Sequence, residues 1–142
     1  MTRIVVLLCG PPGAGKSTAA RASGLSVFDR DDARWRTDAE FAAALDRVGA
    51  DTAARAVVIR AGATSTARAR AARTVAATST FVMLAPRDVL IDRVRRRGRG
   101  DRVRTIAGVD RWLARFDRDD GVRDFPGWAA ALAPDLGVSS PW

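Results

Sequence analysis

The hydrophobic pattern of the chain predicts short buried strands that alternate with amphipathic helices. Four runs of β-branched and large apolar residues have the length of buried strands: 3–9, 25–28, 57–59 and 81–84. Helical spacing or strong helix formers fill the intervals and follow the last run: 17–22, a helix capped by Thr37, 51–56, 65–76, a helix begun by Pro86, and 109–118. This alternation predicts a parallel, doubly wound α/β sheet.

The ends of these elements carry local signals. Thr37 and Glu40 have the spacing of a capping box, and Gly49 is expected to end the helix that they begin. The tail from Phe125, which contains proline and tryptophan, is expected to be irregular or to form a short helix. Since no repeat or linker divides the chain, residues 1–142 are expected to form a single domain.

Composition removes several classes of catalytic site. The chain has 142 residues, 47% hydrophobic and 28% charged, which is a globular balance. It contains no histidine and a single cysteine, Cys9, so histidine triads, His-ligated zinc and disulfide frameworks are excluded. The apolar run at 4–9 is too short to span a membrane, so we expect no membrane partner and a cytoplasmic location. Carboxylates, hydroxyls, backbone amides and cations remain for chemistry.

A phosphate-binding loop follows the first predicted strand. The segment fits the P-loop pattern G-x-x-x-x-G-K-[ST] and consists of Gly10, Pro11, Pro12, Gly13, Ala14, Gly15, Lys16, Ser17 and Thr18. Gly13 and Gly15 let successive N–H groups face a phosphate, and Lys16 can reach the β and γ oxygens of a nucleoside triphosphate. Ser17 offers a hydroxyl to Mg²⁺. The alternative is a Gly/Pro-rich turn that holds no ligand.

Positive charge gathers in one later segment. The formal net charge is +8, and Lys16 is the one lysine among 24 basic residues. Residues 93–104 hold seven arginines and one aspartate. In a P-loop kinase this position is a lid, here about 93–106, that closes over the phosphates. We expect Arg93 and Arg97 to act on the transferring group, with the remaining lid arginines being Arg95, Arg96, Arg99 and Arg102. A solvated arginine run or a nucleic-acid patch are the alternatives.

Three carboxylates, Asp29, Asp31 and Asp32, follow the second predicted strand. Ligands of open α/β sheets bind beyond the carboxyl ends of the strands, so one of these aspartates can orient an acceptor hydroxyl and take its proton. Another can help to hold Mg²⁺, and Asp29 is our candidate together with the P-loop serine. Arg34 could reach a phosphate on the acceptor, and Trp35 could stack on a base or sugar.

These residues resemble the 5′-hydroxyl kinase domain of phage-type polynucleotide kinases. The resemblance is carried by the P-loop and by the run Phe-Asp-Arg-Asp-Asp-Ala-Arg at 28–34. It implies a P-loop NTPase three-layer sandwich with a four- to five-stranded parallel sheet and an arginine-rich lid. It also implies ATP or GTP and Mg²⁺ as cofactors, Asp31 as general base and Arg34 as a clamp on the phosphate beside the 5′ end. A nucleic-acid 5′ end would be the partner, and a phage protein acting in the host cytoplasm the setting.

One position departs from that family. An aspartate commonly follows its third strand, whereas here Ile59 leads into Arg60, Ala61 and Gly62, which also removes the usual Walker B carboxylate. Three hypotheses therefore remain: a polynucleotide 5′-hydroxyl kinase, a P-loop kinase of a small hydroxyl acceptor such as a nucleoside, nucleotide sugar or antibiotic, and a nucleotide-binding protein without transfer activity whose basic segment binds nucleic acid. The sequence leaves the oligomeric state open.

Overall fold

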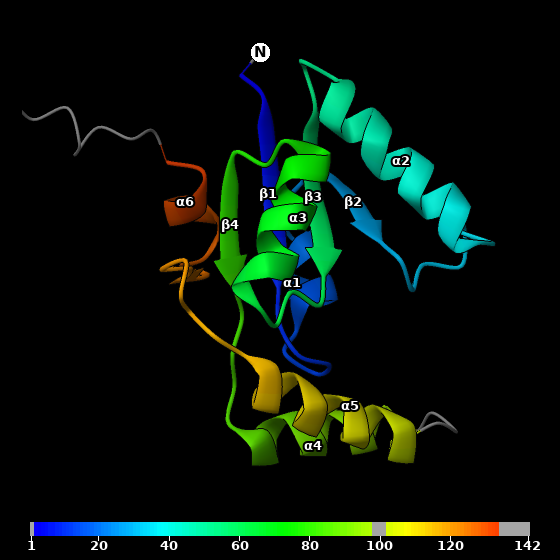
Figure 1. The fold of residues 1–142 in the computed structure, drawn as a ribbon, viewed down its shortest axis with the longest axis vertical. Helices are drawn as coiled ribbons and strands as arrows, with labels where there is room; N and C mark the ends of the chain where they lie inside the picture. The colour runs from blue at the N-terminus through cyan, green and yellow to red at the C-terminus, as the bar shows by residue number, and fades with distance from the viewer. Residues whose placement is uncertain (1, 98–101, 134–142) are drawn as a thin grey trace, which may run out of the picture.

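The computed structural model describes residues 2–97 and 102–133. Within this part the strands and helices follow one another along the chain as β1 Ile4–Cys9, α1 Lys16–Arg21, β2 Ser26–Asp29, α2 Asp38–Ala50, β3 Arg55–Arg60, α3 Ser65–Val75, β4 Ser79–Val82, α4 Arg87–Arg96, α5 Arg102–Arg115, β5 Arg123–Asp124 and α6 Trp128–Ala131 (Figure 1).

The strands form one parallel sheet, as the alternating pattern predicts. Its order is β2-β3-β1-β4-β5, and every neighbouring pair runs in the same direction. The first strand, β1, lies in the middle and pairs with β3 along its whole length, from Ile4 opposite Arg55 to Cys9 opposite Arg60. Parallel order brings all carboxyl ends to one edge, where the loops after β1, β2 and β3 meet.

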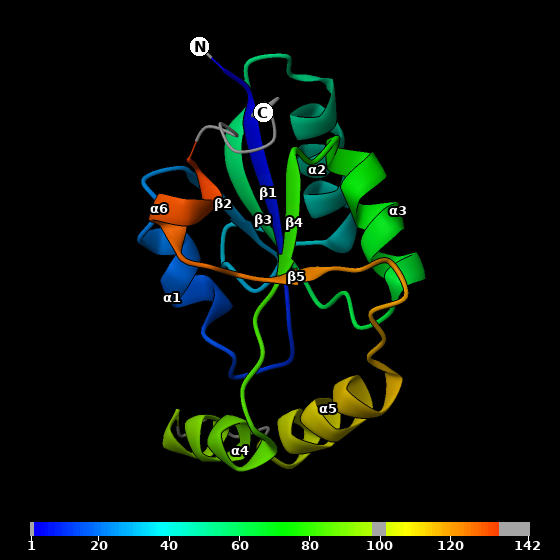
Figure 2. The ribbon, with the colours of Figure 1, turned by 90° about the vertical axis from the view of Figure 1, so that its left-hand side faces the viewer.

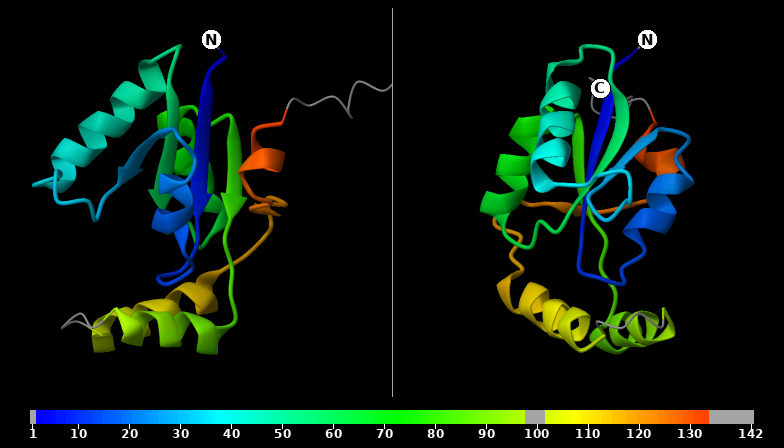
Figure 3. Two further views of the ribbon diagram at one scale, coloured as in Figure 1. Left: turned by 180° about the vertical axis from the view of Figure 1, so that it is seen from behind. Right: turned by 90° about the vertical axis from the view of Figure 1, so that its right-hand side faces the viewer.

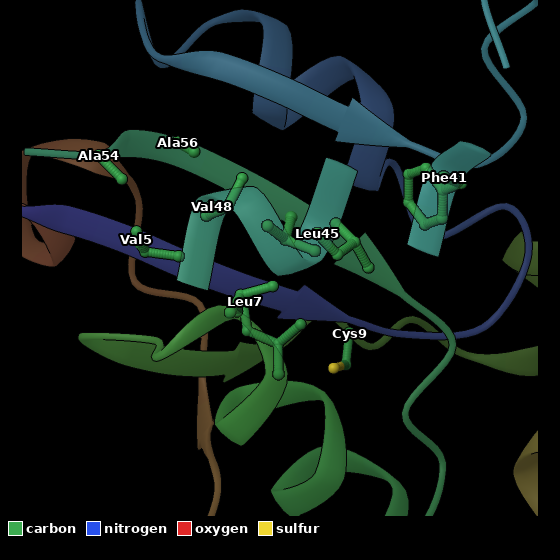
Figure 4. Packing of buried hydrophobic residues seen from close by; sticks show 10 residues of the cluster. Val5, Leu7, Cys9, Phe41, Leu45, Val48, Ala54 and Ala56 are labelled. Atoms are coloured by element: carbon green, nitrogen blue, oxygen red, sulfur yellow. The ribbon is translucent and has the colours of Figure 1, made fainter. Parts of the chain in front are cut away.

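Helices cover both faces of the sheet, which gives three layers (Figure 2). Alternate residues of β1 point to opposite faces. Val5, Leu7 and Cys9 pack with α2 and α3 (Figure 4), whereas Val6 and Leu8 pack with α1 and with the segment that contains α6. Burial on both faces explains why the strand is a continuous apolar run.

The α4 and α5 helices lie beyond the carboxyl edge of the sheet (Figure 3). Leu90 and Val94 of α4 and Val109 of α5 are buried against one another and against Ala14 of the P-loop. The predicted lid at about 93–106 therefore includes the end of α4 and the beginning of α5, and its centre, residues 98–101, lies outside the described residues.

A buried arginine fastens the loop after α5 to the body of the domain. The Arg68 side chain, on α3, is 1% exposed, and its guanidinium donates to both Asp120 carboxylate oxygens at 3.0 and 2.8 Å. It also donates to the backbone oxygens of Gly62, Ala63 and Asp117. The hydrogen bond and charge of Arg68 hold the pKa of Asp120 below its usual range.

Several predicted boundaries are wrong. No helix forms over 51–56, because the Asp51 carboxylate accepts from the backbone N–H of Ala53 at 2.8 Å and closes a turn before β3. Gly49 lies inside α2, where a Cβ would meet the backbone of Thr74 on α3. The fourth strand lies two residues earlier than predicted, and α5 begins at 102 rather than 109. An additional strand, β5, comes directly before the predicted tail, which forms a short helix, α6.

Candidate active site

The P-loop connects β1 to α1 with a backbone that its glycines permit. Gly13 and Gly15 adopt φ angles of 83° and 93°, which side chains disfavour. A Cβ on Gly13 would also lie 2.9 Å from the backbone oxygen of Leu90 on α4. The loop is thus packed against α4, which explains why glycine is needed there for space as well as for conformation.

Lys16 is folded into this loop. Its Nζ donates to the backbone oxygens of Gly10 at 2.5 Å and Pro11 at 2.9 Å. Burial lowers the pKa of Lys16 to about 8, and the nearby charges of Asp29 and Asp31 oppose that shift. The ammonium is therefore held in a place where an anionic ligand would raise its pKa.

Ser17 and Asp29 meet as the sequence predicts. The Ser17 hydroxyl donates to Asp29 Oδ2 at 2.6 Å, and Asp29 Oδ1 accepts from the backbone N–H of Asp31 at 3.1 Å. A hydroxyl and a carboxylate are hard oxygen ligands of the kind that Mg²⁺ takes when substrate phosphates and water complete its shell. Within the described residues, no group of three or more Asp, Glu, Cys or His side chains is arranged so that it could hold a metal ion.

One cavity of about 620 Å³ joins the P-loop to the end of β2. Lys16, Ser17, Asp29 and Asp31 line it, and Arg97 reaches it from the end of α4. The predicted phosphate, metal and base residues are thus brought together around one space, with Asp31 exposed to solvent beside it.

The other arginines of the predicted lid are placed differently. Arg93, on α4, donates to the backbone oxygen of Gly13 at 3.0 Å, so it connects α4 to the P-loop backbone. Arg95 and Arg96 are exposed, and Arg96 pairs with Asp92 on its own helix at 3.0 Å. Arg99 lies outside the described residues, as does the side chain of Arg102.

The residues predicted to hold the acceptor lie elsewhere. The Arg34 guanidinium stacks over the rings of Trp35 and Phe28, at 4.5 and 5.3 Å, and donates to the backbone oxygen of Val27. Trp35 packs between Phe28 and Phe41 against the core. The described lining of the cavity contains neither of them.

Two arginines that sequence reasoning passed over do line the cavity, Arg30 and Arg60. Each stands at the carboxyl end of a strand, Arg30 directly after β2 and Arg60 as the last residue of β3. Their position could have identified them, because ligands of open α/β sheets bind beyond the carboxyl ends of the strands.

The α5 helix contacts the same edge through one backbone oxygen. The carbonyl of Ala61 accepts from the N–H of Gly10, at 3.1 Å, and from Nε1 of Trp112 on α5, at 2.7 Å. The start of the P-loop and α5 are thus both hydrogen-bonded to the residue that follows β3.

Solved structures that share this fold include two kinases. A gluconokinase from Sinorhizobium meliloti 1021 gives a TM-score of 0.56 at 16% identity, over 85% of this chain and 80% of that one. A shikimate kinase from Acinetobacter baumannii, in complex with shikimate, gives 0.54 at 14% identity, over 92% and 90%. No protein-family model and no curated protein matches the chain. The likeness confirms the α/β three-layer fold with a parallel sheet.

In the described part of the chain, no helix has the length and apolar character needed to cross a membrane.

Proposed function

We propose that the protein is a phosphotransferase that moves the γ-phosphoryl group of ATP or GTP to an alcohol. The observation that carries this proposal is the shared cavity of Lys16, Ser17, Asp29 and Asp31. Phosphoryl transfer needs phosphate positioning, a metal and a group that orients the attacking hydroxyl, and these are the functions that the side chains can supply.

The P-loop would hold the nucleotide. Lys16 would exchange the carbonyl oxygens of Gly10 and Pro11 for β and γ phosphate oxygens, which are better acceptors for an ammonium. Ser17 and Asp29 would hold Mg²⁺ when it is bound, and the ion would offset charge on the phosphates. Arg97 would add a guanidinium from the lid side of the same cavity.

Asp31 would act on the acceptor. Its carboxylate would take the proton of the acceptor hydroxyl as the oxygen forms a bond to the γ phosphorus. The bond from that phosphorus to the β–γ bridging oxygen breaks, and the nucleoside diphosphate leaves. Because Asp31 and Lys16 line the same cavity, one space can hold both the γ-phosphate and the acceptor hydroxyl.

Two acceptor classes each have an observation in their favour. The run at 28–34, with its polynucleotide-kinase pattern, favours the 5′-hydroxyl of a DNA or RNA end. Arg34 stacks on aromatic rings and is outside the described lining of the cavity, which favours a small-molecule hydroxyl. The gluconokinase and the shikimate kinase that share this fold are named as kinases of small molecules, which supports the second class.

The test is a transfer assay with γ-labelled ATP and Mg²⁺. The acceptors are a 5′-hydroxyl oligonucleotide, nucleosides, sugar acids and sugar alcohols. We expect label on at least one acceptor and a loss on the order of 100-fold with Asp31→Asn. The matched control is Asp32→Asn. The Asp32 carboxylate accepts from the backbone N–H of Arg34, and Asp32 is outside the described lining of the cavity.

Each outcome decides between the hypotheses. Label on the oligonucleotide alone identifies the first acceptor class, and label on small alcohols alone identifies the second. Tight binding of ATP with no transfer to any member of the panel refutes the enzyme and leaves a nucleotide-binding protein. Equal turnover in the Asp31 and Asp32 variants refutes the assignment of the base.

A further inference from the structure

A second cavity adjoins the cavity beside the P-loop, on the side of α2 and α3. Its volume is about 770 Å³, within the range of small-molecule sites. Phe41 and Leu45 of α2, Val58 of β3 and Ala71 of α3 give it an apolar lining. Both cavities include Arg30, Arg60 and Ala61 in their linings, so the two spaces meet at the ends of β2 and β3.

Arg60 lies at this junction. In the part of the chain that the structure describes, its side chain contacts the ring of Phe41, whose centroid is 5.5 Å from the guanidinium carbon. That contact steadies the side chain but leaves the N–H donors available. Arg30, by comparison, is paired with Asp38 at 2.7 Å.

The charges around the second cavity therefore favour an anion beside Arg60. Arg30 and Asp38 offset each other, which leaves Arg60 and Arg70 against Asp46 among the charged residues of the lining. A planar guanidinium with free donors is suited to a carboxylate or a phosphate.

We propose that Arg60 binds an anionic group of the acceptor, and that the second cavity receives a small alcohol that carries a carboxylate or a phosphate ester. This inference rests on the proposed function, since the acceptor must present its hydroxyl to Asp31. Arg60 and Asp31 line the same cavity, so one molecule can reach both. The apolar floor between α2 and α3 would take the carbon skeleton of the acceptor.

The experiment compares acceptors that share one skeleton. Glucitol, gluconate and glucitol 6-phosphate differ in being neutral, a carboxylate and a phosphate ester, and thymidine with thymidine 3′-monophosphate forms a second set. Binding is measured by calorimetry in the presence of ADP and Mg²⁺, and transfer is measured separately with labelled ATP. We expect at least one anionic member to bind about tenfold or more tightly than its neutral counterpart.

Variants at position 60 connect that preference to the side chain. Arg60→Gln is expected to weaken the anion by about tenfold while the neutral member changes by less than about twofold. Arg60→Asp should weaken the anion further, and Arg60→Lys should retain part of the preference because it keeps the charge without the planar fork. The matched control is Arg73→Gln, since Arg73 is an exposed arginine of α3 outside both linings.

The two proposals fail in different ways. If no anionic member binds better than its neutral counterpart, or if Arg60→Gln weakens both equally, the anion site is wrong even when transfer is observed. If Arg60→Gln instead raises the KM for ATP with every acceptor, Arg60 belongs to the nucleotide and the inference is overturned. Binding of an oligonucleotide through Arg60 with no preference among the small anions overturns the small-molecule occupant. Arg60-dependent anion binding without any transfer supports the site and refutes the phosphotransferase.

Discussion

Nucleotide binding should take up a proton at Lys16. In the free protein, burial lowers the pKa of this ammonium to about 8. The phosphates of a bound nucleotide would favour the charged form, so the pKa rises on binding and the site binds a proton from solution wherever the free form is partly neutral.

The size of the effect follows from the pKa. With a free pKa of about 8, the neutral fraction, and hence the uptake, is about 0.1 proton at pH 7, 0.5 at pH 8 and 0.9 at pH 9. Affinity should therefore fall as pH rises, by nearly tenfold per unit above about pH 8. Burial raises the pKa of the Cys9 thiol to about 11, so that group stays protonated throughout this range.

Calorimetry measures this uptake directly. MgADP is titrated into the protein at pH 7, 8 and 9 in buffers with different ionisation enthalpies, and the slope of the apparent enthalpy against buffer enthalpy gives the number of protons. Lys16→Arg is the control, because a guanidinium keeps its charge at these pH values and should show no uptake. An affinity that is constant from pH 7 to 9, with no proton uptake at pH 8, would refute the placement of Lys16 as the buried phosphate ligand.

Other substitutions test the packing around the site. Gly13→Ala should weaken nucleotide binding by about tenfold or more, because its Cβ would meet an α4 carbonyl at 2.9 Å; Gly24→Ala has a similar φ of 76° and open space, and should leave binding unchanged in the same titration. Arg68→Met should lower the free energy of unfolding by roughly 3–5 kcal/mol in urea, since it leaves Asp120 and several carbonyls unpaired; a loss below about 1 kcal/mol would contradict that role. Asp29→Asn should raise the Mg²⁺ concentration needed for nucleotide binding on the order of tenfold, and an unchanged Mg²⁺ titration would remove it as a ligand.

The parts of the fold that sequence could predict are those governed by local pattern. The run that ends at Cys9, the glycines of the P-loop and Lys16 specify strand, turn and helix within a few residues of one another. The meeting of Ser17 with Asp29 was predictable too, because parallel strands put both at one edge.

The parts that could not be predicted depend on distant partners. A hydrophobic pattern does not show that Arg34 will stack on Phe28 and Trp35. The same sequence is equally compatible with an arginine that extends toward a ligand. Gly49 lies inside α2 because the backbone of α3 comes close to it. The turn at Asp51 forms because its carboxylate accepts a backbone hydrogen bond that is incompatible with a continued helix. The hydrogen bond from Arg93 to the backbone oxygen of Gly13 depends on the packing of α4 on the loop, which the sequence does not show; the action of Arg93 on phosphate stays a prediction.

The oxygen of Ala61 has a consequence for how this architecture can change over generations. It receives the P-loop amide and the indole of Trp112, yet it belongs to the main chain, so any amino acid at position 61 would provide it. Substitutions at that position can thus change the lining of both cavities without breaking the two hydrogen bonds to its carbonyl. Divergent descendants could acquire new ligands there while the P-loop and α5 stay hydrogen-bonded to the same carbonyl.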